Sequence, residues 1–309
     1  MKILVTGGAG FIGSHIVDAY IERGHQAVVV DDLSTGNRSN LNSLATFYQA
    51  DICSPELADV FEEERPSVIS HHAAQADVRR SVLDPILDAK VNILGSLNLL
   101  ECARRFGVNR FIFGSSGGTV YGEPKYLPCD EAHPVQPISP YGASKHTVEQ
   151  YLAMYNRSFG LEYVAFRYAN VYGPRQNPRG EAGVVAIFTS QMLLAKQVDI
   201  YGDGEQTRDF LHVVDCVAAN LLALTYPAPN TVYNLGTGRG TSINHVFRAL
   251  KKITGYSRSP AHAPPKIGET RSIYLDAQRI NRDLGWSPSV DVEEGLEETV
   301  RWYREHATA

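Results

Sequence analysis

The amino-acid sequence predicts an α/β protein, in which a doubly wound parallel sheet is followed by a smaller mixed α/β C-terminal domain. Through about residue 170, short apolar runs alternate with longer amphipathic stretches, a pattern typical of parallel strands covered by helices on both faces. A glycine-rich segment separates the first apolar run from the first amphipathic stretch. From residues 172–174 onward Pro and Gly become frequent and the apolar runs shorten, as expected of a smaller second domain.

The predicted strands are short apolar runs rich in β-branched and aromatic residues. They are residues 3–5, 27–30, 46–49, 68–70, 110–113 and 163–167. The predicted helices carry apolar residues at helical spacing. They run from the glycine-rich segment to about residue 23, near 56–64, from about 84 to 106, and from 140 to about 159. Residues 231–235 form a further apolar run that we expect to return to the first sheet, so we divide the chain into domains 1–173 and 174–309.

Composition excludes several classes of function. The chain of 309 residues has a formal net charge of -5 and no basic stripe, which argues against a nucleic-acid partner. Its four cysteines are scattered without metal-ligand spacing, which favours reduced thiols in a cytoplasmic protein. His71 and His72 do not suggest a metal, because adjacent strand residues point to opposite faces. We see no cleavable signal and no apolar run of membrane-spanning length, so we expect no membrane partner.

The glycine-rich segment predicts a dinucleotide site. Gly7, Gly10 and Gly13 are spaced three residues apart between a strand and a helix, and Phe11 and Ile12 fall in the first helical turn. Glycines at such a turn let the backbone approach a pyrophosphate closely, and the helix N-terminus attracts its charge. We therefore assign these five residues to cofactor binding.

Acidic residues after the next two strands complete the predicted cofactor site. Asp31 follows the second strand, where a carboxylate can accept hydrogen bonds from an adenosine ribose. Its charge would repel a 2′-phosphate, which favours NAD over NADP. Asp32 is a second candidate, although it is equally explained as an ordinary loop acid. Asp51 and Ile52 follow the third strand and could frame the adenine; for Asp51, capping of a helix is the alternative.

Tyr141 and Lys145 are the candidate catalytic pair. Residues four apart on a helix share a face, and an ammonium beside a phenol favours its ionised form, which suits proton transfer. Ser139 is a good N-cap and Pro140 a good first helical residue, so Tyr141 should lie in the first turn. A second Tyr-x-x-x-Lys match begins at Tyr121, but its intervening Gly and Pro prevent a helix.

Together these residues resemble the extended short-chain dehydrogenase/reductase family, and within it the nucleotide-sugar 4-epimerases. The resemblance implies a Rossmann-type NAD-binding domain and NAD-dependent 4-epimerisation of a nucleotide sugar through a transient 4-keto sugar. UDP-glucose and UDP-galactose are the first expected pair of substrates. The matching segments occur in the family's order and cover most of the chain: residues 6–13, 72–75, 115–122, 141–145, 167–174 and 203–210.

The resemblance assigns roles near the reacting carbon. Tyr141 becomes the general base and acid, and Lys145 holds the nicotinamide ribose. A loop hydroxyl should bond the substrate oxygen at the reacting carbon. The loop has one residue more than the family pattern, so the hydroxyl is ambiguous: Ser116 is our choice, with Thr119 and Ser115 as alternatives.

The resemblance also assigns residues to binding of the cofactor and of the sugar nucleotide. Ala73, Ala74 and Gln75 should run beside the cofactor. Asn92 matches a cofactor-side asparagine, with a hydrogen bond inside its helix as the alternative. Asn170 should contact the nucleotide sugar.

Three charged residues are assigned to the nucleotide by the same resemblance. Arg208 matches an arginine that binds the diphosphate, and a surface ion pair with Asp203 or Glu205 is the alternative explanation. Lys266 and Glu269 stand where relatives carry Arg-x-Gly-Asp, which contacts the diphosphate and the nucleotide ribose. They keep both charges and lose the bidentate arginine fork.

The exact reaction and the sugar stay open. The acidic pair of related dehydratases is missing, because Thr119 and Val120 stand in its place. Ile273 aligns with a position where some glucose-type enzymes carry a bulkier Tyr, so UDP-N-acetylglucosamine is an alternative substrate, as is UDP-glucuronate. The same residues would also suit a nucleotide-sugar reductase or dehydrogenase, or a nucleotide-sensing binding protein.

The resemblance also suggests a homodimer formed through the helix from about residue 84 and the Tyr141 helix. Leu94, Leu97, Leu152 and Tyr155 are candidates for that contact, and each is equally explained as core.

Overall fold

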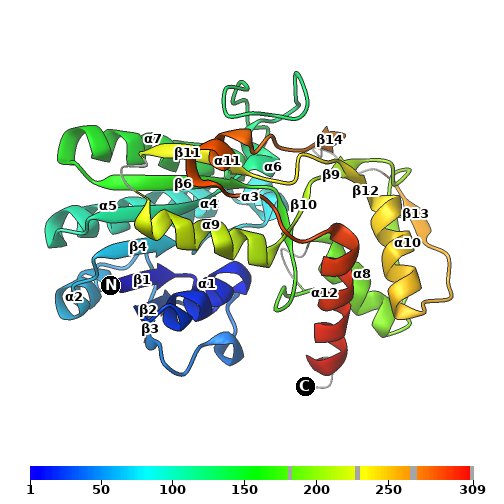
Figure 1. Ribbon diagram of the computed structural model, residues 1–309, viewed down its shortest axis with the longest axis horizontal. Coiled ribbons are helices and arrows are strands. Elements are labelled where there is room, and N and C mark those ends of the chain that lie inside the picture. The colour runs from blue at the N-terminus through cyan, green and yellow to red at the C-terminus, as the bar shows by residue number, and fades with distance from the viewer. Residues whose placement is uncertain (180–182, 227–229, 265–269, 307–309) are drawn as a thin grey trace.

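The computed structural model describes residues 1–179, 183–226, 230–264 and 270–306. Its centre is a seven-stranded sheet in the order β11-β6-β5-β4-β1-β2-β3, in which every neighbouring pair is parallel (Figure 1). The strands are β1 (Lys2–Thr6), β2 (Gln26–Asp31), β3 (Thr46–Gln49), β4 (Val68–His71), β5 (Arg110–Ser116), β6 (Glu162–Tyr168) and β11 (Thr231–Leu235). The sheet confirms the predicted α/β class, and β11 pairs with β6, so the late strand does return to the first sheet.

Helices cover both faces of this sheet because strand side chains alternate between them. The helices on the first face are α1 (Phe11–Glu22), α9 (Val213–Thr225) and α11 (Gln278–Leu284). Those on the second face are α2 (Leu57–Glu64), α5 (Gly95–Phe106) and α7 (Pro140–Phe159). Ile3 and Val5 join one core with side chains of α1 and α9, whereas Leu4 joins a second core with side chains of α2, α5 and α7.

The prediction of one uninterrupted helix from about 84 to 106 is wrong. The segment begins as α4 (Pro85–Ala89), passes through a π-helical turn, η2 (Lys90–Leu94), and continues as α5. A separate short helix, α3 (Val78–Leu83), precedes it and was not predicted; Asp77 caps its first turn. The π turn contains Asn92, whose buried side chain bonds the segment after β4. Such turns are frequent at functional sites.

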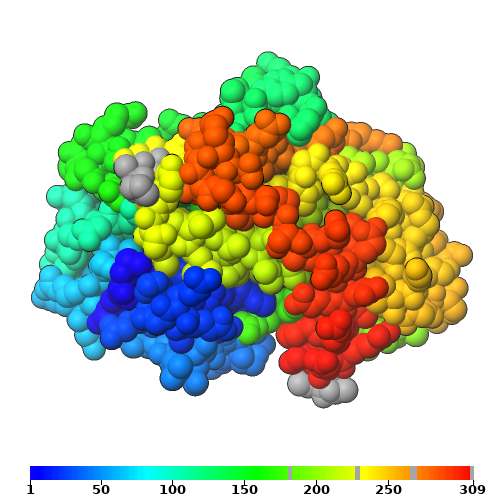
Figure 2. Space-filling view, in the orientation of Figure 1, coloured from blue at the N-terminus to red at the C-terminus, as the bar shows by residue number. Residues whose placement is uncertain are grey.

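The C-terminal part has its own apolar core, which unites helices α8 (Val184–Leu193), α10 (Ile243–Thr254) and α12 (Val292–His306). In the space-filling view α12, in red, lies beside the yellow and orange residues of α10 (Figure 2). Short strands frame this part of the chain. They are β7 (Asn170–Tyr172) with β10 (Phe210–His212), β8 (Asp199–Tyr201) with β13 (Ala261–Ala263), and β9 (Thr207–Arg208) with β12 (Thr241–Ser242) and β14 (Ser272–Ile273).

The division into domains 1–173 and 174–309 stays a prediction. The large sheet and its covering helices draw on both stretches of the chain, since α9 packs against α1, and α11 packs against β11. The second stretch therefore contributes both a strand and covering helices to the large sheet.

Candidate functional site

The site is built at the point where the strand order reverses. β1 lies between β4 and β2, and the chain leaves β1 toward one side of the sheet and β4 toward the other. The segments that follow β1 and β4 therefore meet at the carboxyl edge of the sheet, which is where ligands bind in open α/β sheets. These segments hold the predicted glycines and residues 73–75.

The glycine turn is shaped for close backbone approach. Gly7 has a φ of +70°, and a Cβ there would lie 2.6 Å from the amide nitrogen of Ala73. A Cβ on Gly13 would lie 2.2 Å from the carbonyl oxygen of Gly7, so the helix can pack on the turn only without a side chain. Gly10 is the N-cap of α1 and has no side chain to cap it, which leaves the first-turn amides of Phe11 and Ile12 to an anion. The turn therefore fits a dinucleotide pyrophosphate.

Asp31 closes the turn from β2. Its carboxylate accepts hydrogen bonds from the amides of Ala9, at 2.9 Å, and Leu33, at 2.8 Å. Burial raises the pKa of Asp31, and these two backbone hydrogen bonds oppose that shift. Asp32 is exposed and accepts from the amide and hydroxyl of Ser34, which is the role of an ordinary loop acid.

The adenine-side candidates lie after β3. Asp51 is exposed and accepts a 2.8 Å hydrogen bond from the amide of Cys53, so it caps a turn. Ile52 is buried in the second core and touches Gly95 at the start of α5. The N-cap of the next helix, α2, is Glu56, so Asp51 does not cap a helix as the alternative supposed.

Residues 73–75 are held by a buried polar cluster. Asn92 accepts from the amide of Gln75 at 2.9 Å and donates to its carbonyl oxygen at 2.8 Å. Asp88, which is fully buried, accepts from Asn92 and Gln75 and also from the hydroxyl of Ser144 on α7, at 2.6 Å. Asn92 therefore fixes the segment after β4, and Asp88 ties that segment to α7. Asp88 was not predicted as a site residue.

Tyr141 and Lys145 lie on one face of α7, as predicted. Ser139 is the N-cap, its hydroxyl accepting from the amide of Gly142, and Pro140 opens the helix. The Lys145 ammonium is 5.7 Å from the centre of the Tyr141 ring. It also donates a 2.8 Å hydrogen bond to the carbonyl oxygen of Gly114 at the end of β5. Lys145 is 4% exposed, so its charge is held at this position by protein contacts rather than by water.

The three candidate hydroxyls have different surroundings. Ser115 is buried and donates a 2.6 Å hydrogen bond to Glu149, so its hydroxyl is engaged in the interior. Ser116 ends β5 and is partly exposed. Thr119 lies in the single turn α6 (Gly117–Val120), and its buried Oγ1 has no partner among the described residues. These surroundings favour Ser116 and Thr119 over Ser115.

The substrate-side candidates lie beyond β6. Asn170 begins β7, and its buried Oδ1 has no hydrogen-bond partner within the described part of the chain. Arg208 donates to the carbonyl oxygen of Thr207, whereas Asp203 is paired with Arg271. Lys266 and Glu269 lie outside the described residues.

Asp209, next to Arg208, was not predicted. Its carboxylate is buried and accepts from the amides of Thr237, Gly238 and Leu275 and from the Thr237 hydroxyl. Burial raises its pKa, and the hydrogen bonds from Thr237 oppose the rise. Asp209 therefore joins the Arg208 strand to two later loops.

The adjacent histidines are both hydrogen-bonded to hydroxyls; His71 is buried and His72 is partly exposed. The ring nitrogens of His71 lie 2.7 Å from the Thr6 hydroxyl and 2.9 Å from the Ser96 hydroxyl, and His72 lies 2.9 Å from the Ser70 hydroxyl. Over residues 1–179, 183–226, 230–264 and 270–306, no group of three or more His, Cys, Asp or Glu could hold a metal ion. No helix in the same ranges is long and apolar enough to cross a bilayer.

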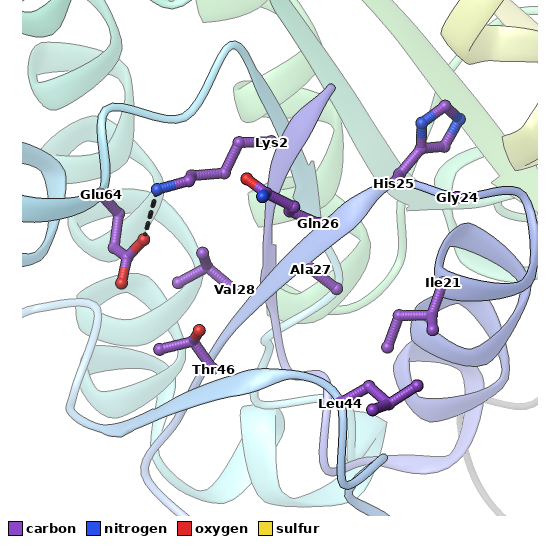
Figure 3. A pocket seen from close by; sticks show the side chains of 10 residues that line it. All are labelled: Lys2, Ile21, Gly24, His25, Gln26, Ala27, Val28, Leu44, Thr46 and Glu64. Carbon is purple, nitrogen blue, oxygen red and sulfur yellow. Dashed lines mark hydrogen bonds and ion pairs between the residues drawn. The ribbon is translucent and has the colours of Figure 1, made fainter.

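A cavity of about 450 Å³ lies away from these residues (Figure 3). Lys2, Gln26 and Thr46, which begin β1, β2 and β3, line it, so it opens at the amino edge of the sheet. The Lys2 ammonium bonds the Glu64 carboxylate at 2.8 Å across it. Since ligands of open parallel sheets bind at the carboxyl edge, this cavity is not part of the candidate site.

A buried ion pair lies under the hydroxyl loop and was not predicted either. Glu149 on α7 is 2% exposed and Arg167 on β6 is 5% exposed, and the two form a bidentate pair with distances of 3.0 and 2.7 Å. Burial alone would raise the pKa of Glu149, but hydrogen bonds from His146 and Arg167 lower it, so the carboxylate is ionised. The sequence feature that could have revealed this pair is Arg167, a charged residue in the otherwise apolar run 163–167, because a buried charge needs a partner.

Comparison with known proteins gives consistent matches over nearly the whole chain. A model of the NAD dependent epimerase/dehydratase family matches residues 3–236. UDP-glucose 4-epimerase of Mycolicibacterium smegmatis is 44% identical over 309 residues, covering 98% of this chain and 99% of that protein. The crystal structure of UDP-glucose 4-epimerase with UDP-glucose from Thermotoga maritima has 51% identity and a TM-score of 0.98, covering 99% of this chain and 100% of that one. The structure of Thermus thermophilus UDP-glucose 4-epimerase in complex with NAD has 43% identity and a TM-score of 0.94, with the same coverage.

Proposed function

The chain belongs to the NAD dependent epimerase/dehydratase family, and we propose that it interconverts UDP-glucose and UDP-galactose by inverting carbon 4 of the sugar. The proposal is carried by one observation: a Tyr and a Lys share a helix face at the carboxyl edge of the sheet, with the ammonium 5.7 Å from the phenol ring. That pair can remove and return one proton. The site has no acidic pair of the dehydratase type in its hydroxyl loop, where Thr119 and Val120 stand.

NAD is the cofactor, and the chain's own residues fit it. The turn of Gly7, Gly10 and Gly13 would receive the pyrophosphate at the first-turn amides of α1, and Asp31 would accept from the adenosine ribose. Ala73 and Ala74 are small enough to let the dinucleotide run beside them. Bound NAD would supply a reversible hydride acceptor for carbon 4, so no external oxidant would be consumed.

Tyr141 handles the proton of the sugar 4-hydroxyl. As a phenolate it accepts that proton while carbon 4 becomes a ketone, and it returns the proton when the ketone is reduced from the other face. Lys145 supports this role with its charge and would hold the nicotinamide ribose. Ser116 donates a hydrogen bond to the oxygen on carbon 4; Thr119 is the alternative donor.

The nucleotide is held away from the reacting carbon. Arg208 would bind the diphosphate and Asn170 the nucleotide sugar. The orphaned amide oxygen of Asn170 supports this assignment, because a buried acceptor that the protein leaves unpaired gains most from a ligand donor. Rotation of the neutral 4-keto sugar about its diphosphate linkage presents the second face of carbon 4.

The deciding experiment incubates purified protein with UDP-glucose and no added NAD. We expect UDP-galactose to form without net NADH. A requirement for stoichiometric added cofactor would instead identify a reductase or dehydrogenase, and binding without turnover would identify a nucleotide-sensing protein.

A parallel assay tests the sugar specificity. UDP-N-acetylglucosamine and UDP-glucuronate are run beside UDP-glucose. Ile273 lies in a buried apolar cluster with Val120 and Leu275. Because it is smaller than the Tyr of some glucose-type enzymes, it would leave more room for an N-acetyl group. We expect UDP-glucose to turn over fastest and UDP-N-acetylglucosamine to be the second substrate. Failure with all three would redirect the nucleotide assignment.

We also propose that the protein is a homodimer. Val82, Leu83, Ile86 and Leu94, from α3, α4 and the π turn, are 60%, 85%, 81% and 58% exposed. Such an apolar face on helices beside α7 is suited to a second copy of the chain. Leu152 and Tyr155, by contrast, are buried core residues.

A cytoplasmic location remains our proposal as well. All four cysteines are free thiols, which is expected in a reducing compartment.

A further inference from the structure

The loop that carries Ser116 and Thr119 is tied down at its beginning by the Glu149–Arg167 pair. Ser115 donates to Glu149 Oε1 at 2.6 Å, and Arg167 Nε donates to the same oxygen at 3.0 Å. Ser115 and Arg167 are paired residues on the neighbouring strands β5 and β6. Glu149 of α7 therefore binds both strands at the same level of the sheet. The Ser115 side chain is thereby fixed one residue before Ser116.

The end of the same loop is tied to the same pair. Arg167 Nη1 donates to the hydroxyl of Tyr121 at 3.0 Å, and that hydroxyl donates to Asn234 Oδ1 at 2.6 Å. Tyr121 is fully buried, and its ring lies 5.0 Å from the Arg167 guanidinium carbon. One ion pair therefore holds both ends of residues 115–121.

Glu149 is also on the catalytic face of α7. Tyr141, Lys145 and Glu149 follow one another at intervals of four, so they lie on one stripe of the helix. Lys145 bonds the carbonyl oxygen of Gly114 and Glu149 bonds the Ser115 hydroxyl, so consecutive residues of β5 are bound to consecutive turns of α7. The contacts between β5 and α7 therefore position the loop hydroxyls and the Tyr141 phenol relative to each other.

A buried ion pair is weak evidence for stability, because the cost of desolvating two charges offsets their attraction. Its bidentate geometry instead fixes relative positions, and displacement of a reacting group by about 1 Å can cost 10²-fold in rate. We propose that Glu149 and Arg167 are positioning residues, which clamp both ends of the 115–121 loop and so place its hydroxyl donor against the substrate oxygen that Tyr141 deprotonates. The inference rests on the proposed epimerase function.

The test is Tyr121→Phe, which removes both loop-end hydrogen bonds, from Arg167 and to Asn234, and leaves the ion pair and all proposed site residues in place. We expect kcat for UDP-glucose to fall about 10-fold, with KM within about 2-fold and bound NAD retained. The matched control is Tyr155→Phe on α7, which likewise deletes a hydrogen bond donated by a tyrosine hydroxyl, in this case to Glu101. Tyr155 lies about four turns, or roughly 20 Å, farther along the helix than Tyr141, so its loss should leave kcat unchanged.

A double-mutant cycle distinguishes positioning from general loosening of the fold. If the clamp acts by placing Ser116, then Tyr121→Phe slows the wild type about 10-fold and adds less than about 2-fold in a Ser116→Ala background. If Thr119 is the donor, the same coupling appears with Thr119→Ala. Additive effects in both backgrounds, or equal losses of kcat in Tyr121→Phe and Tyr155→Phe, overturn the inference. An inactive wild type overturns the proposed function instead, so the two failures are distinguishable.

Discussion

The Lys145 ammonium donates a 2.8 Å hydrogen bond to the carbonyl oxygen of Gly114, two residues before Ser116. This contact ties α7, which carries the proposed catalytic pair, to β5, which leads into the loop of candidate hydroxyls. Because Lys145 is buried, the bond also compensates for part of the cost of holding an ammonium out of water. The same side chain therefore orders the site and supplies its charge.

Tyr141→Phe should abolish epimerisation while leaving the fold and ligand binding intact. The phenol is partly exposed, so loss of its oxygen creates no core cavity. We expect kcat to fall by about 10³-fold or more, since removal of a general base costs about 10²–10⁴. Steady-state kinetics with UDP-glucose, together with calorimetric binding of UDP, checks both parts. Retained turnover would show that another group moves the proton.

Lys145→Met should lower both activity and cofactor retention. The substitution keeps the aliphatic stem and removes the charge and the bond to Gly114. We expect kcat to fall about 10²-fold and the purified protein to carry less NAD. Lys252→Met, an exposed lysine on α10, is the control and should behave as wild type. Full NAD occupancy and full activity in Lys145→Met would contradict the assigned role.

Gly13→Ala should disrupt the cofactor turn. Its Cβ would lie 2.2 Å from the carbonyl oxygen of Gly7. Relief of this clash would require the main chain at Gly13 or at Gly7 to move. We expect loss of bound NAD and a fall in melting temperature. In Gly24→Ala the new Cβ meets nothing within 4 Å, so only the backbone cost of a φ of +77° remains, about 1–2 kcal/mol. NAD content measured after release from both variants makes the comparison; equal NAD content would refute the assignment.

Stability should fall as the pH is lowered below 6.5. Burial and the nearby Lys145 charge lower the pKa of His72 from 6.5 to about 3, so the folded protein holds His72 neutral. The unfolded chain takes up a proton below pH 6.5 and the folded protein does not until about pH 3, so unfolding is favoured by about 1.4 kcal/mol per pH unit between these values.

Urea unfolding at pH 7 and pH 5 measures this effect. His72→Gln should reduce the difference in unfolding free energy between the two pH values by about 2 kcal/mol. An unchanged difference would mean that His72 titrates alike in both states.

Charges on the exposed apolar face should separate the proposed dimer. In Leu83→Asp with Ile86→Asp, two carboxylates would have to be buried at the contact, which costs several kcal/mol. We expect light scattering to report the dimer mass for the wild type and half that mass for the variant. Since both side chains are exposed, the monomer should still fold, and far-ultraviolet circular dichroism checks this. A monomeric wild type would rule out the dimer.

The sequence predicted those features whose causes are local. A Gly turn after a strand, and a Ser-Pro entry before Tyr141, each have one structural solution, and both are present. The π turn at Asn92 could not be predicted, because it depends on hydrogen bonds to Gln75 and Asp88 that only the folded chain brings together. Helical periodicity over 84–106 therefore suggested one regular helix.

The Glu149–Arg167 pair could not be predicted from the sequence for the same reason. Arg167 was visible as a charge in an apolar strand, but its partner Glu149 lies 18 residues earlier on a different element. The choice between Ser116 and Thr119 depends on which way a loop turns, which residue spacing does not encode.

The placement of β11 sets an order of events during synthesis. Among the described residues, 231–235 alone pair with the side of β6 that faces away from β5, so a nascent chain that ends before them leaves β6 as the edge strand. Ribosomes must therefore translate well into the second stretch before all seven strands of the sheet are present. Messages truncated upstream of that point should yield aggregation-prone fragments, even though every glycine of the cofactor turn and the Tyr141 helix are already complete.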